Sequence, residues 1–480
     1  MRPGDLSAQH VHVQPANSFR VAVLGGGISG LAAAHFLRKL YAPARLDITL
    51  VEADPRLGGK IRTDPLASRP VEGGPDGFLA RVPEALELCC DLGLAESLVS
   101  PGGGPAYLWM GGRLRAIPGG MGLGVPTGLS GIAFTGLLSP FGVARAALDL
   151  ALPRTRLAKD ESVSRLVAAR FGSEVAERLV DPLLSGIFAG DAGQLSARAV
   201  TPELYEVAQQ NRSLLLGLRR LPKRPQGPAF RSVRDGLETL VARIRAGLPD
   251  VRWELGCRAM SIDNEASGRY SVALEGGRQL EAEAVVVALP AFAAAAVLRQ
   301  LSPAAASALS SIGYSSVATV AMAYPIGAMP PLRGTGFLVP RREGRLVVGC
   351  TWLSSKWPHL SGGPVLVRCA VGRVGDERWR QLDDRELTRR VHAELEAALD
   401  SNLPTPETWR VTRWERAIPQ YTVGHLERVE SAERELAGWP GLVLTGAAYR
   451  GVGVASCIAQ AKTAAARLVG LARMEKGAAD

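Results

Sequence analysis

The hydrophobic pattern of the first hundred residues predicts a buried strand, a turn and a helix in direct succession. The run Val21 to Leu24 is apolar and short, as expected for a buried strand. Leu31 to Leu40 is rich in alanine and leucine at helical spacing, and Asp47 to Val51 forms a second strand-like run. Alternating strands and helices of this kind predict an α/β fold with a parallel sheet.

A glycine motif lies between the first strand and the helix. Gly25, Gly27 and Gly30 have the G-x-G-x-x-G spacing, in which the glycines allow a tight turn, close approach of a pyrophosphate and close helix packing. The free N–H groups of the helix N-terminus then face the phosphate charge. Glu52 follows the second strand, where an acid accepts hydrogen bonds from ribose hydroxyls. A solvated acid at a strand end is the alternative for Glu52.

The middle of the chain changes to a mainly helical pattern. Pro83 to Leu98 predicts a helix that begins with proline, and Tyr107 to Arg113 predicts a hairpin. Pro126 to Phe188 carries helical spacing, and Glu203 to Leu218 predicts one further helix. Pro222 to Pro228 is rich in proline and basic residues, which is typical of a linker.

The pattern in the second half of the chain predicts a return to the first domain, with a second sheet inserted between the strands of that domain. A helix from Arg234 to Ala246 precedes strands at Val251–Leu255, Tyr270–Leu274 and Glu283–Leu289. The apolar run in the last of these is typical of a parallel strand covered on both faces. A broad antiparallel sheet with one helix is predicted from Val317–Tyr324, Gly336–Pro340, Leu346–Trp352, Val365–Gly372 and Asp384–Asp400. The strand Leu442 to Gly446, a glycine turn and an alanine-rich helix to about Ala472 close the chain.

Composition narrows the class of protein. With 480 residues and 47% hydrophobic residues, the chain is expected to form two or three globular domains. Its six cysteines make no C-x-x-C pair and follow no secretory signal, which favours reduced thiols in a cytoplasmic protein without a metal site.

The net charge and two long uncharged stretches raise two further classes of protein, those that bind nucleic acid and those that bind or span a membrane. A net charge of +10 attracts nucleic acid, membranes or anionic substrates, but the arginines are scattered and no nucleic-acid motif is present. Ala116 to Ala144 and Gln300 to Leu332 are long enough to span a membrane, yet glycine and proline interrupt both. We therefore expect Ala116 to Ala144 to pack within a substrate-lining domain and to make, at most, peripheral membrane contact.

A second glycine signature points to a flavin. Arg56 to Thr63 reads Arg-Leu-Gly-Gly-Lys-Ile-Arg-Thr and resembles the second signature of flavoproteins of the amine oxidase and protoporphyrinogen oxidase superfamily. FAD is therefore preferred to NAD. The later turn Gly73 to Gly77 would bring backbone close to the isoalloxazine ring of a flavoprotein, and an ordinary surface turn is the alternative.

From Arg20 to Ala472 the chain resembles the oxygen-dependent porphyrinogen oxidases, flavoenzymes of haem synthesis. Besides the glycine motifs, Ser185 to Asp191 and Ile418 to Tyr421 carry this resemblance. Asp181 to Gly186 and Thr412 to Glu415 are more similar to the coproporphyrinogen III branch than to the protoporphyrinogen IX branch. Many protoporphyrinogen enzymes have an arginine where this chain has Ala106.

The resemblance implies an architecture and a set of site residues. The fold would be α/β, with a discontinuous Rossmann-like FAD-binding domain, an inserted α+β substrate domain and a helical subdomain. The expected parts are a disordered extension (1–18), FAD-binding segments (19–100, 229–290 and 431–473), the helical subdomain (101–220) and the antiparallel-sheet substrate domain (291–430). The implied FAD contacts are Gly25, Gly26, Gly27, Ile28, Ser29, Gly30, Glu52, Ala53, Lys60, Gly74, Pro75, Asp76, Gly77, Ala259, Trp414, Ala447, Val452, Gly453 and Val454.

Arg81, Lys356 and Arg450 are hypothetical partners of substrate carboxylates, with solvated surface charge as the alternative for each. No catalytic side chain is implied, because flavin N5 accepts the hydride. His425 and His359 are candidates for an acid or base, but a structural role is the simpler interpretation.

The implied activity is oxidation of coproporphyrinogen III to coproporphyrin III, a six-electron reaction in which O2 reoxidises FAD and yields hydrogen peroxide. Protoporphyrinogen IX oxidase is the alternative within the family. A generic amine oxidase and a non-catalytic tetrapyrrole carrier are more distant alternatives. A ferrochelatase is an expected downstream partner, and the sequence leaves open whether the protein is a monomer or a homodimer.

Overall fold

The computed structural model describes residues 18–41, 46–122, 124–128, 130–155, 159–222, 227–265 and 268–477. The extension expected at residues 1–18 lies outside these ranges except for Ser18. Residues 223–226 of the expected linker also lie outside them.

A five-stranded parallel sheet unites three distant parts of the chain. In spatial order it consists of β12 (Arg252–Leu255), β2 (Leu46–Glu52), β1 (Phe19–Leu24), β16 (Ala284–Val287) and β22 (Leu442–Leu444). All four neighbouring pairs run parallel. The prediction of an α/β fold with a parallel sheet is thereby confirmed.

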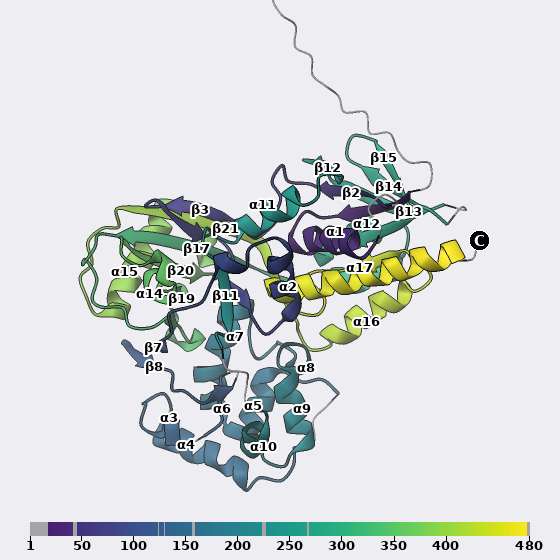
Figure 1. Cartoon of the computed structure of the whole chain (residues 1–480). Helices are drawn as coiled ribbons and strands as arrows, with labels where there is room; N and C mark the ends of the chain where they lie inside the picture. The colour runs from purple at the N-terminus through teal and green to yellow at the C-terminus, as the bar shows by residue number, and fades with distance from the viewer. Residues whose placement is uncertain are drawn as a thin grey trace, which may run out of the picture.

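Helices cover one face of this sheet, and a mixed layer covers the other. Val21 and Val23 of β1 pack toward α1 (Ile28–Leu40), α2 (Pro83–Asp91), α11 (Glu238–Ala246) and α17 (Val454–Gly477). Ala22 and Leu24 pack toward α12 (Ala291–Leu298), α13 (Pro303–Ser310) and α16 (His425–Glu435). Figure 1 shows α17, in yellow, running alongside α1. Burial on both faces explains the unbroken apolar runs in the sequence.

The second layer also contains a small antiparallel sheet. It is formed by β13 (Ala259–Asn264), β14 (Tyr270–Leu274) and β15 (Gln279–Ala282). The sequence interpretation assigned Tyr270–Leu274 to the first domain's strands, but it belongs to this separate sheet. Its residues alternate between buried and half-buried, which is typical of a strand covered on one face only.

A seven-stranded sheet is the second large sheet of the fold. Its order is β21 (Thr408–Pro419), β17 (Tyr314–Tyr324), β20 (Val365–Val371), β19 (Val347–Thr351), β18 (Gly336–Leu338), β7 (Ala106–Met110) and β8 (Arg113–Ala116). The expected broad antiparallel sheet is present, but it includes one parallel pair, β18 with β7. Helix α15 (Asp384–Leu399) covers one face through residues such as Leu387, Val391 and Leu395.

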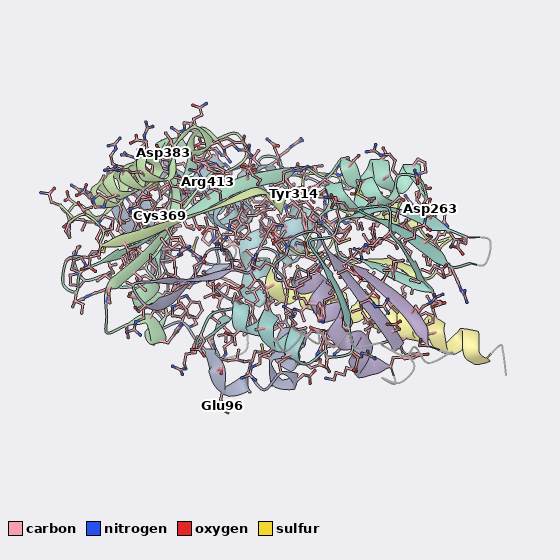
Figure 2. All side chains as sticks on the ribbon, turned by 90° about the horizontal axis from the view of Figure 1, so that it is seen from above. Glu96, Asp263, Tyr314, Cys369, Asp383 and Arg413 are labelled. Atoms are coloured by element: carbon pink, nitrogen blue, oxygen red, sulfur yellow. The ribbon has the colours of Figure 1, made fainter. Side chains whose placement is uncertain are left out.

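The two sheets meet near the start of β17. Figure 2 shows Tyr314 between Cys369, Arg413 and Asp383 on the side of the seven-stranded sheet and Asp263 at the opposite end. The face of this sheet that is turned away from α15 carries Thr319 and Arg368, which contact the glycine-rich turn Gly73 to Gly77. This junction positions the candidate site.

A helical subdomain lies below both sheets (Figure 1). It contains α3 (Ser130–Ala133), α4 (Pro140–Ala147), α5 (Val163–Phe171), α6 (Ser173–Val175), the π-helical turn Ala176–Val180, α7 (Asp181–Phe188), α8 (Ala197–Val200), α9 (Pro202–Gln210) and α10 (Leu214–Arg220). A buried ion pair joins Arg170 Nε to Asp149 Oδ1 at 2.6 Å inside it. Across the described ranges, we find no helix with both the length and the apolar character needed to cross a bilayer.

Two predicted helices are shorter than expected. The helix predicted to reach Leu98 ends at Asp91, because Gly93 takes a left-handed φ of +69°, and Leu98–Val99 forms strand β6. The single helix predicted from Glu203 to Leu218 breaks after Gln210. Ser213 caps the new helix α10 by accepting a hydrogen bond from Leu216 N.

The remaining short elements connect these layers. They are β3 (Thr63–Leu66), β4 (Arg69–Glu72), β5 (Phe78–Leu79), β9 (Met121–Gly122), β10 (Val125–Pro126), β11 (Phe230–Val233), α14 (Leu353–Lys356) and the 3-10 turns Ala95–Ser97, Leu148–Leu150, Arg341–Glu343, Pro358–Leu360 and Arg378–Gln381. All six cysteines lie in described ranges and are free thiols.

Candidate functional site

The turn after β1 is closed so tightly that two of its glycines have no room for a side chain. A Cβ on Gly25, whose φ is +107°, would lie 2.7 Å from the Ala288 carbonyl oxygen, and one on Gly30 would lie 1.9 Å from the Gly25 carbonyl oxygen. Gly27 differs, since a Cβ there would meet no described atom within 4 Å. Gly27 is the N-cap of α1, so open space borders a helix N-terminus with unpaired N–H groups.

Glu52 is tied to this turn from the end of β2. Its Oε2 accepts a hydrogen bond from Gly26 N at 2.6 Å, and its Oε1 accepts one from Asp54 N at 2.8 Å. Each carboxylate oxygen keeps a second lone pair for a ligand hydroxyl. Cys257 N donates to the Glu52 carbonyl oxygen at 2.9 Å, which places the segment leading to Ala259 beside the same strand end.

The second glycine signature lies directly against the first. Gly58 N donates to the Gly26 carbonyl oxygen at 2.8 Å, and a Cβ on Gly59 would lie 3.3 Å from Gly27 Cα. The Arg56 guanidinium donates to carbonyl oxygens of its own loop, at Leu57 (2.9 Å) and Ile61 (2.8 Å) and at Gly59. Arg56 therefore shapes the loop.

Lys60 ends this loop beside helix α17. Its side chain is exposed, yet the protein around the ammonium removes enough water to lower its pKa, an effect that the neighbouring Cys457 thiol partly opposes. Lys60 therefore lies close to Cys457 of α17. A cation there would attract an anionic ligand.

The third glycine-rich turn, Gly73 to Gly77, is held by side chains of the seven-stranded sheet. The Gly73 carbonyl oxygen accepts hydrogen bonds from Trp414 Nε1 at 2.8 Å and Thr319 Oγ1 at 3.0 Å. Arg368 Nη1 donates to the carbonyl oxygens of Glu72 at 2.7 Å and Gly74 at 2.9 Å. Three strands thus fix this turn.

The same turn also contacts the second glycine loop. A Cβ on Gly74 would lie 2.1 Å from the Lys60 carbonyl oxygen, and Gly73 N donates to the Arg62 carbonyl oxygen at 2.8 Å. The second glycine loop therefore contacts both the first glycine turn and the turn Gly73 to Gly77, so the three segments predicted from separate parts of the N-terminal region form one continuous backbone surface.

Asp76 connects the turn to two cations. Its Oδ2 lies 2.8 Å from Lys356 Nζ and 3.7 Å from Arg368 Nη2, and it accepts a hydrogen bond from Trp357 Nε1 at 3.4 Å. Burial alone would raise the pKa of Asp76, but the charges of Lys356 and Arg368 outweigh it and lower the pKa to about 2. Asp76 is therefore ionised at neutral pH.

Glu72, at the start of the same turn, is a buried acid with the opposite behaviour. Its Oε1 accepts from Leu237 N at 2.6 Å and its Oε2 from Thr63 Oγ1 at 3.0 Å. Burial dominates these hydrogen bonds and raises its pKa from 4.5 to about 7. Protonated Glu72 is therefore the form that the folded protein favours below neutral pH.

We expect this carboxyl group to make the protein less stable as the pH rises. Below pH 4.5 the group is protonated in both states, but between 4.5 and about 7 only the unfolded state releases its proton, so unfolding is favoured. The shift corresponds to roughly 3 kcal/mol of unfolding free energy above pH 7. Urea unfolding of the wild type and Glu72→Gln across this range measures it, since the variant should lose this pH dependence. Equal slopes in the two proteins would refute the assignment.

The turn after β22 provides a fourth glycine-rich segment. Gly446 and Gly451 have φ values of +135° and +128°, and α17 begins at Val454. A Cβ on Gly453 would meet nothing within 4 Å among the described atoms, so a second helix N-terminus borders open space. The Ala447 carbonyl oxygen accepts a hydrogen bond from Tyr421 Oη at 2.6 Å, and Val452 packs against the core of the helical subdomain.

The three cations proposed for substrate carboxylates have different surroundings. Lys356 lies at the glycine turn, paired with Asp76 and 5.9 Å from the centre of the Phe230 ring. Arg450 forms two hydrogen bonds with Glu433 of α16. Arg81 is exposed just after β5. Only Lys356 among the three contacts the glycine-rich surface.

The two histidines considered for acid or base chemistry are both withdrawn from bulk solvent. His425 is fully buried, and burial lowers its pKa to about 4. His359 is half-buried beside the Trp357 ring, and desolvation lowers its pKa as well. A buried, neutral His425 fits a structural role.

The two sequence elements that carried the family resemblance lie in contact. Buried Gln420 donates from Nε2 to the Phe188 carbonyl oxygen at 2.8 Å, at the end of α7. The next residue, Ala189, takes a left-handed φ of +46°. Gln420 thus secures the chain where α7 ends.

Sequence reasoning missed Arg368, Thr319 and the role of Tyr421. Arg368 is the single charged residue in the otherwise apolar strand Val365–Val371, a signal that could have identified it. Thr319 and Tyr421 carry no such signal.

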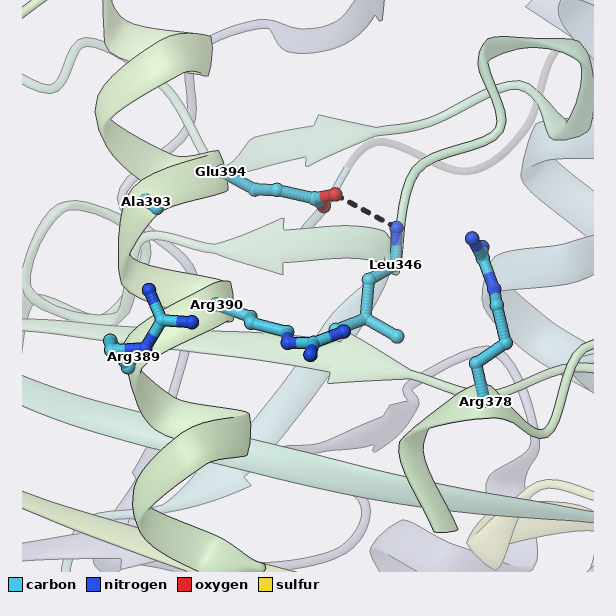
Figure 3. A pocket seen from close by; sticks show the side chains of 6 residues that line it. All are labelled: Leu346, Arg378, Arg389, Arg390, Ala393 and Glu394. Carbon is cyan, nitrogen blue, oxygen red and sulfur yellow. Dashed lines mark hydrogen bonds between the residues drawn. The ribbon is translucent and has the colours of Figure 1, made fainter. Parts of the chain in front are cut away.

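A separate pocket of about 240 Å³ lies between α15 and the start of β19 (Figure 3). Arg378, Arg389 and Arg390 line it, but Arg378 pairs with Asp376, and the other two pair with Glu386. Glu394 accepts hydrogen bonds from Leu346 N and Val347 N. Each of its three arginines is therefore already paired with a carboxylate.

The glycine-rich surface fits a dinucleotide. Gly27 and Gly453 leave open space at two helix N-termini, where backbone N–H groups and helix dipoles favour negative charge. Gly25 and Gly30 hold the backbone close, and Glu52 offers acceptors at the strand end.

Comparisons with known proteins agree with this geometry. The model of the family described as flavin containing amine oxidoreductase matches residues 28–469. Coproporphyrinogen III oxidase of Bacillus subtilis (strain 168) is 39% identical over 459 residues, covering 92% of this chain and 96% of the relative. Protoporphyrinogen oxidase of Bos taurus is 35% identical over 502 residues, covering 94% and 98%.

A solved structure from Exiguobacterium sp. 255-15 that carries a provisional protoporphyrinogen oxidase name superposes with a TM-score of 0.84. It is 34% identical and covers 95% of this chain and 99% of its own. Family membership confirms the expected FAD cofactor and the oxidoreductase class. The chain belongs to the family of flavin-containing amine oxidoreductases.

Proposed function

We propose that this protein oxidises coproporphyrinogen III to coproporphyrin III with FAD as cofactor and O2 as electron acceptor. The observation that carries the proposal is the surface formed by the three N-terminal glycine-rich segments, together with the open space at Gly27 and, in the turn after β22, at Gly453. The similarity to coproporphyrinogen III oxidases over more than nine-tenths of the chain supports the choice of substrate.

When bound, FAD supplies a two-electron acceptor for hydride from the carbon bridges of the porphyrinogen. Three two-electron oxidations remove six electrons and six hydrogens from the substrate. Three molecules of O2 take them up as three molecules of hydrogen peroxide. Aromatisation of the macrocycle drives the reaction.

The chain's own residues would bind and orient. Gly25 to Gly30 with α1 would hold the pyrophosphate, and Glu52 would accept hydrogen bonds from the ribose. The turn Gly73 to Gly77 with Trp414, and the turn Ala447 to Val454, would line the ring system. No dedicated acid or base is proposed, since His425 is buried and neutral.

We propose Lys356 and Arg81 as partners of substrate carboxylates. Replacing both by glutamine should raise KM for coproporphyrinogen III about tenfold and affect protoporphyrinogen IX less, since it carries two carboxylates in place of four. Arg389→Gln is the control, because Arg389 is exposed on α15 and pairs with Glu386 of the same helix. Steady-state kinetics on both substrates measures the effect, and equal losses on both would defeat the assignment.

The proposed reaction can be tested without oxygen. Purified yellow protein is mixed anaerobically with coproporphyrinogen III, and the flavin absorbance band is followed by stopped flow. Rapid bleaching supports the oxidase. A band that persists while porphyrinogen remains bound would favour the tetrapyrrole carrier, and faster bleaching by protoporphyrinogen IX would favour the alternative oxidase.

We also propose a peripheral membrane contact through the helical subdomain. Phe134 and Phe141 are 98% and 79% exposed. Residues 113–155 contain four arginines and one acid, Asp149, which is buried against Arg170. Exposed aromatic rings with net positive charge fit an anionic lipid surface.

Replacing Phe134 and Phe141 by serine should weaken binding to vesicles of phosphatidylglycerol and phosphatidylcholine about tenfold or more, because each ring loses apolar contact with lipid. Vesicle co-sedimentation measures this. Ile326→Ser, at a 76% exposed position after β17, is the control. Unchanged binding of the double variant would rule out this surface.

We also propose a downstream partner and a location, and the oligomeric state can be measured. The product would pass to a metal-inserting enzyme of the ferrochelatase type. A cytoplasmic location suits the free thiols. Size-exclusion chromatography with light scattering would separate monomer from homodimer.

A further inference from the structure

Tyr421 joins the two ends of the turn between β22 and α17. Its hydroxyl donates a hydrogen bond to the Ala447 carbonyl oxygen at 2.6 Å and accepts one from Gly451 N at 2.8 Å. The side chain is 1% exposed. One hydroxyl group therefore uses both its donor and an acceptor site on backbone groups four residues apart.

His425 adds a third contact to the same turn. Its ring stacks on that of Tyr421, with centroids 3.8 Å apart and planes at 12°. Its Nε2 lies 3.0 Å from the Tyr449 carbonyl oxygen. Burial keeps the imidazole neutral, so the ring carries one proton. Because a carbonyl oxygen can only accept, this proton is on Nε2, which donates a hydrogen bond to the Tyr449 carbonyl oxygen.

Within the described structure, Gln460 of α17 also supports the turn: its Oε1 accepts a hydrogen bond from Arg450 N at 3.1 Å, and its Nε2 donates one to the Gly451 carbonyl oxygen at 3.4 Å. Both glycines at its ends are left-handed, and one backbone hydrogen bond, from Tyr449 N to the Gly446 carbonyl oxygen at 3.3 Å, lies inside it. The turn leads directly into the N-terminus of α17 at Val454, beside the open space at Gly453. Its conformation therefore decides where this N-terminus points.

We propose that Tyr421, supported by His425, is a positioning residue that organises the turn Ala447 to Gly451 for FAD before the cofactor binds. The inference rests on the proposed function, since it gives this turn a role at the flavin. It acts through preorganisation: the turn is fixed in the free protein, so binding does not have to order it. Tyr421 itself need not touch the cofactor.

Tyr421→Phe tests the inference, because it keeps the ring and its stacking and removes only the hydroxyl. The dissociation constant of FAD from the apo-protein, measured by quenching of flavin fluorescence, should rise about tenfold. Tyr324→Phe is the matched control, since Tyr324 is equally buried and bonds through its hydroxyl to His392 Nδ1 at 2.8 Å in the seven-stranded-sheet body. The control should change FAD affinity less than twofold.

A role in stability alone would lower the melting temperature of apo-Tyr421→Phe without changing FAD affinity, and that result would overturn the inference. If Tyr421→Phe does not fold, His425→Gln and His425→Ala provide the second test. Glutamine keeps an N–H donor and should retain more FAD affinity than alanine, and equal affinities would contradict the inference. A folded wild type that fails to bind FAD would refute the proposed function itself.

Discussion

Replacing Gly27 with alanine is expected to weaken FAD binding on the order of a hundredfold while leaving the apo-protein as stable as the wild type. The added methyl group would meet no described protein atom within 4 Å, and the backbone φ of −73° suits alanine. The methyl group would instead fill the space through which a pyrophosphate approaches the N-terminus of α1. Titration of the apo-protein with FAD measures the affinity, and thermal unfolding without FAD measures stability.

Gly30→Ala is the matched variant, and we expect it to lower the stability of the apo-protein, which Gly27→Ala should leave unchanged. Its methyl carbon would lie 1.9 Å from the Gly25 carbonyl oxygen, so the strand–helix junction must move. We expect the apo-protein itself to lose about 3 kcal/mol of unfolding free energy. If Gly27→Ala also destabilised the apo-protein, or bound FAD normally, the interpretation of the open space at Gly27 would be wrong.

Arg368→Met is expected to destabilise the protein by about 3 kcal/mol and to weaken FAD binding about tenfold. Arg368 donates hydrogen bonds to two backbone carbonyls of the Gly73 turn and lies 3.7 Å from Asp76. Methionine would leave both carbonyl oxygens without this donor and would remove one of the two cations that face the Asp76 carboxylate. Urea unfolding and FAD titration measure the two effects.

Arg389→Met provides the control for this substitution. Arg389 is exposed on α15 and pairs with Glu386 on the same helix, so its loss should leave the unfolding free energy close to that of the wild type. Equal stability of the two variants would show that Arg368 does not hold the turn.

The glycine motifs could be predicted from sequence because their cause is local. Gly25, Gly27 and Gly30 act through backbone shape within a single turn, so their spacing alone indicates the structure. The same holds for parallel strand β16, whose unbroken apolar run follows from burial on both faces. Strand β21 was not predicted from the sequence. It is an edge strand in which arginines, tryptophans and threonines are interspersed, so it contains no continuous apolar run.

The contacts that organise the site could not be predicted in this way. Arg368 meets Gly74 across 294 positions of sequence, and Tyr421 meets Ala447 across 26. Only the packing of the seven-stranded sheet against the parallel-sheet domain brings Arg368 to its turn. Conversely, Arg450 adjoins a glycine turn in sequence, but its side chain pairs with Glu433 on α16. Proximity to a motif along the chain therefore predicted contact with the glycine turn for Lys356 but misplaced the side chain of Arg450.

The most direct test of the proposed function is aerobic turnover of the purified flavoprotein with coproporphyrinogen III and protoporphyrinogen IX in parallel, following porphyrin fluorescence and hydrogen peroxide together. We predict faster formation of coproporphyrin III, with three molecules of peroxide for each porphyrin formed. Preference for protoporphyrinogen IX, or no turnover of either substrate by protein with bound FAD, would contradict the account.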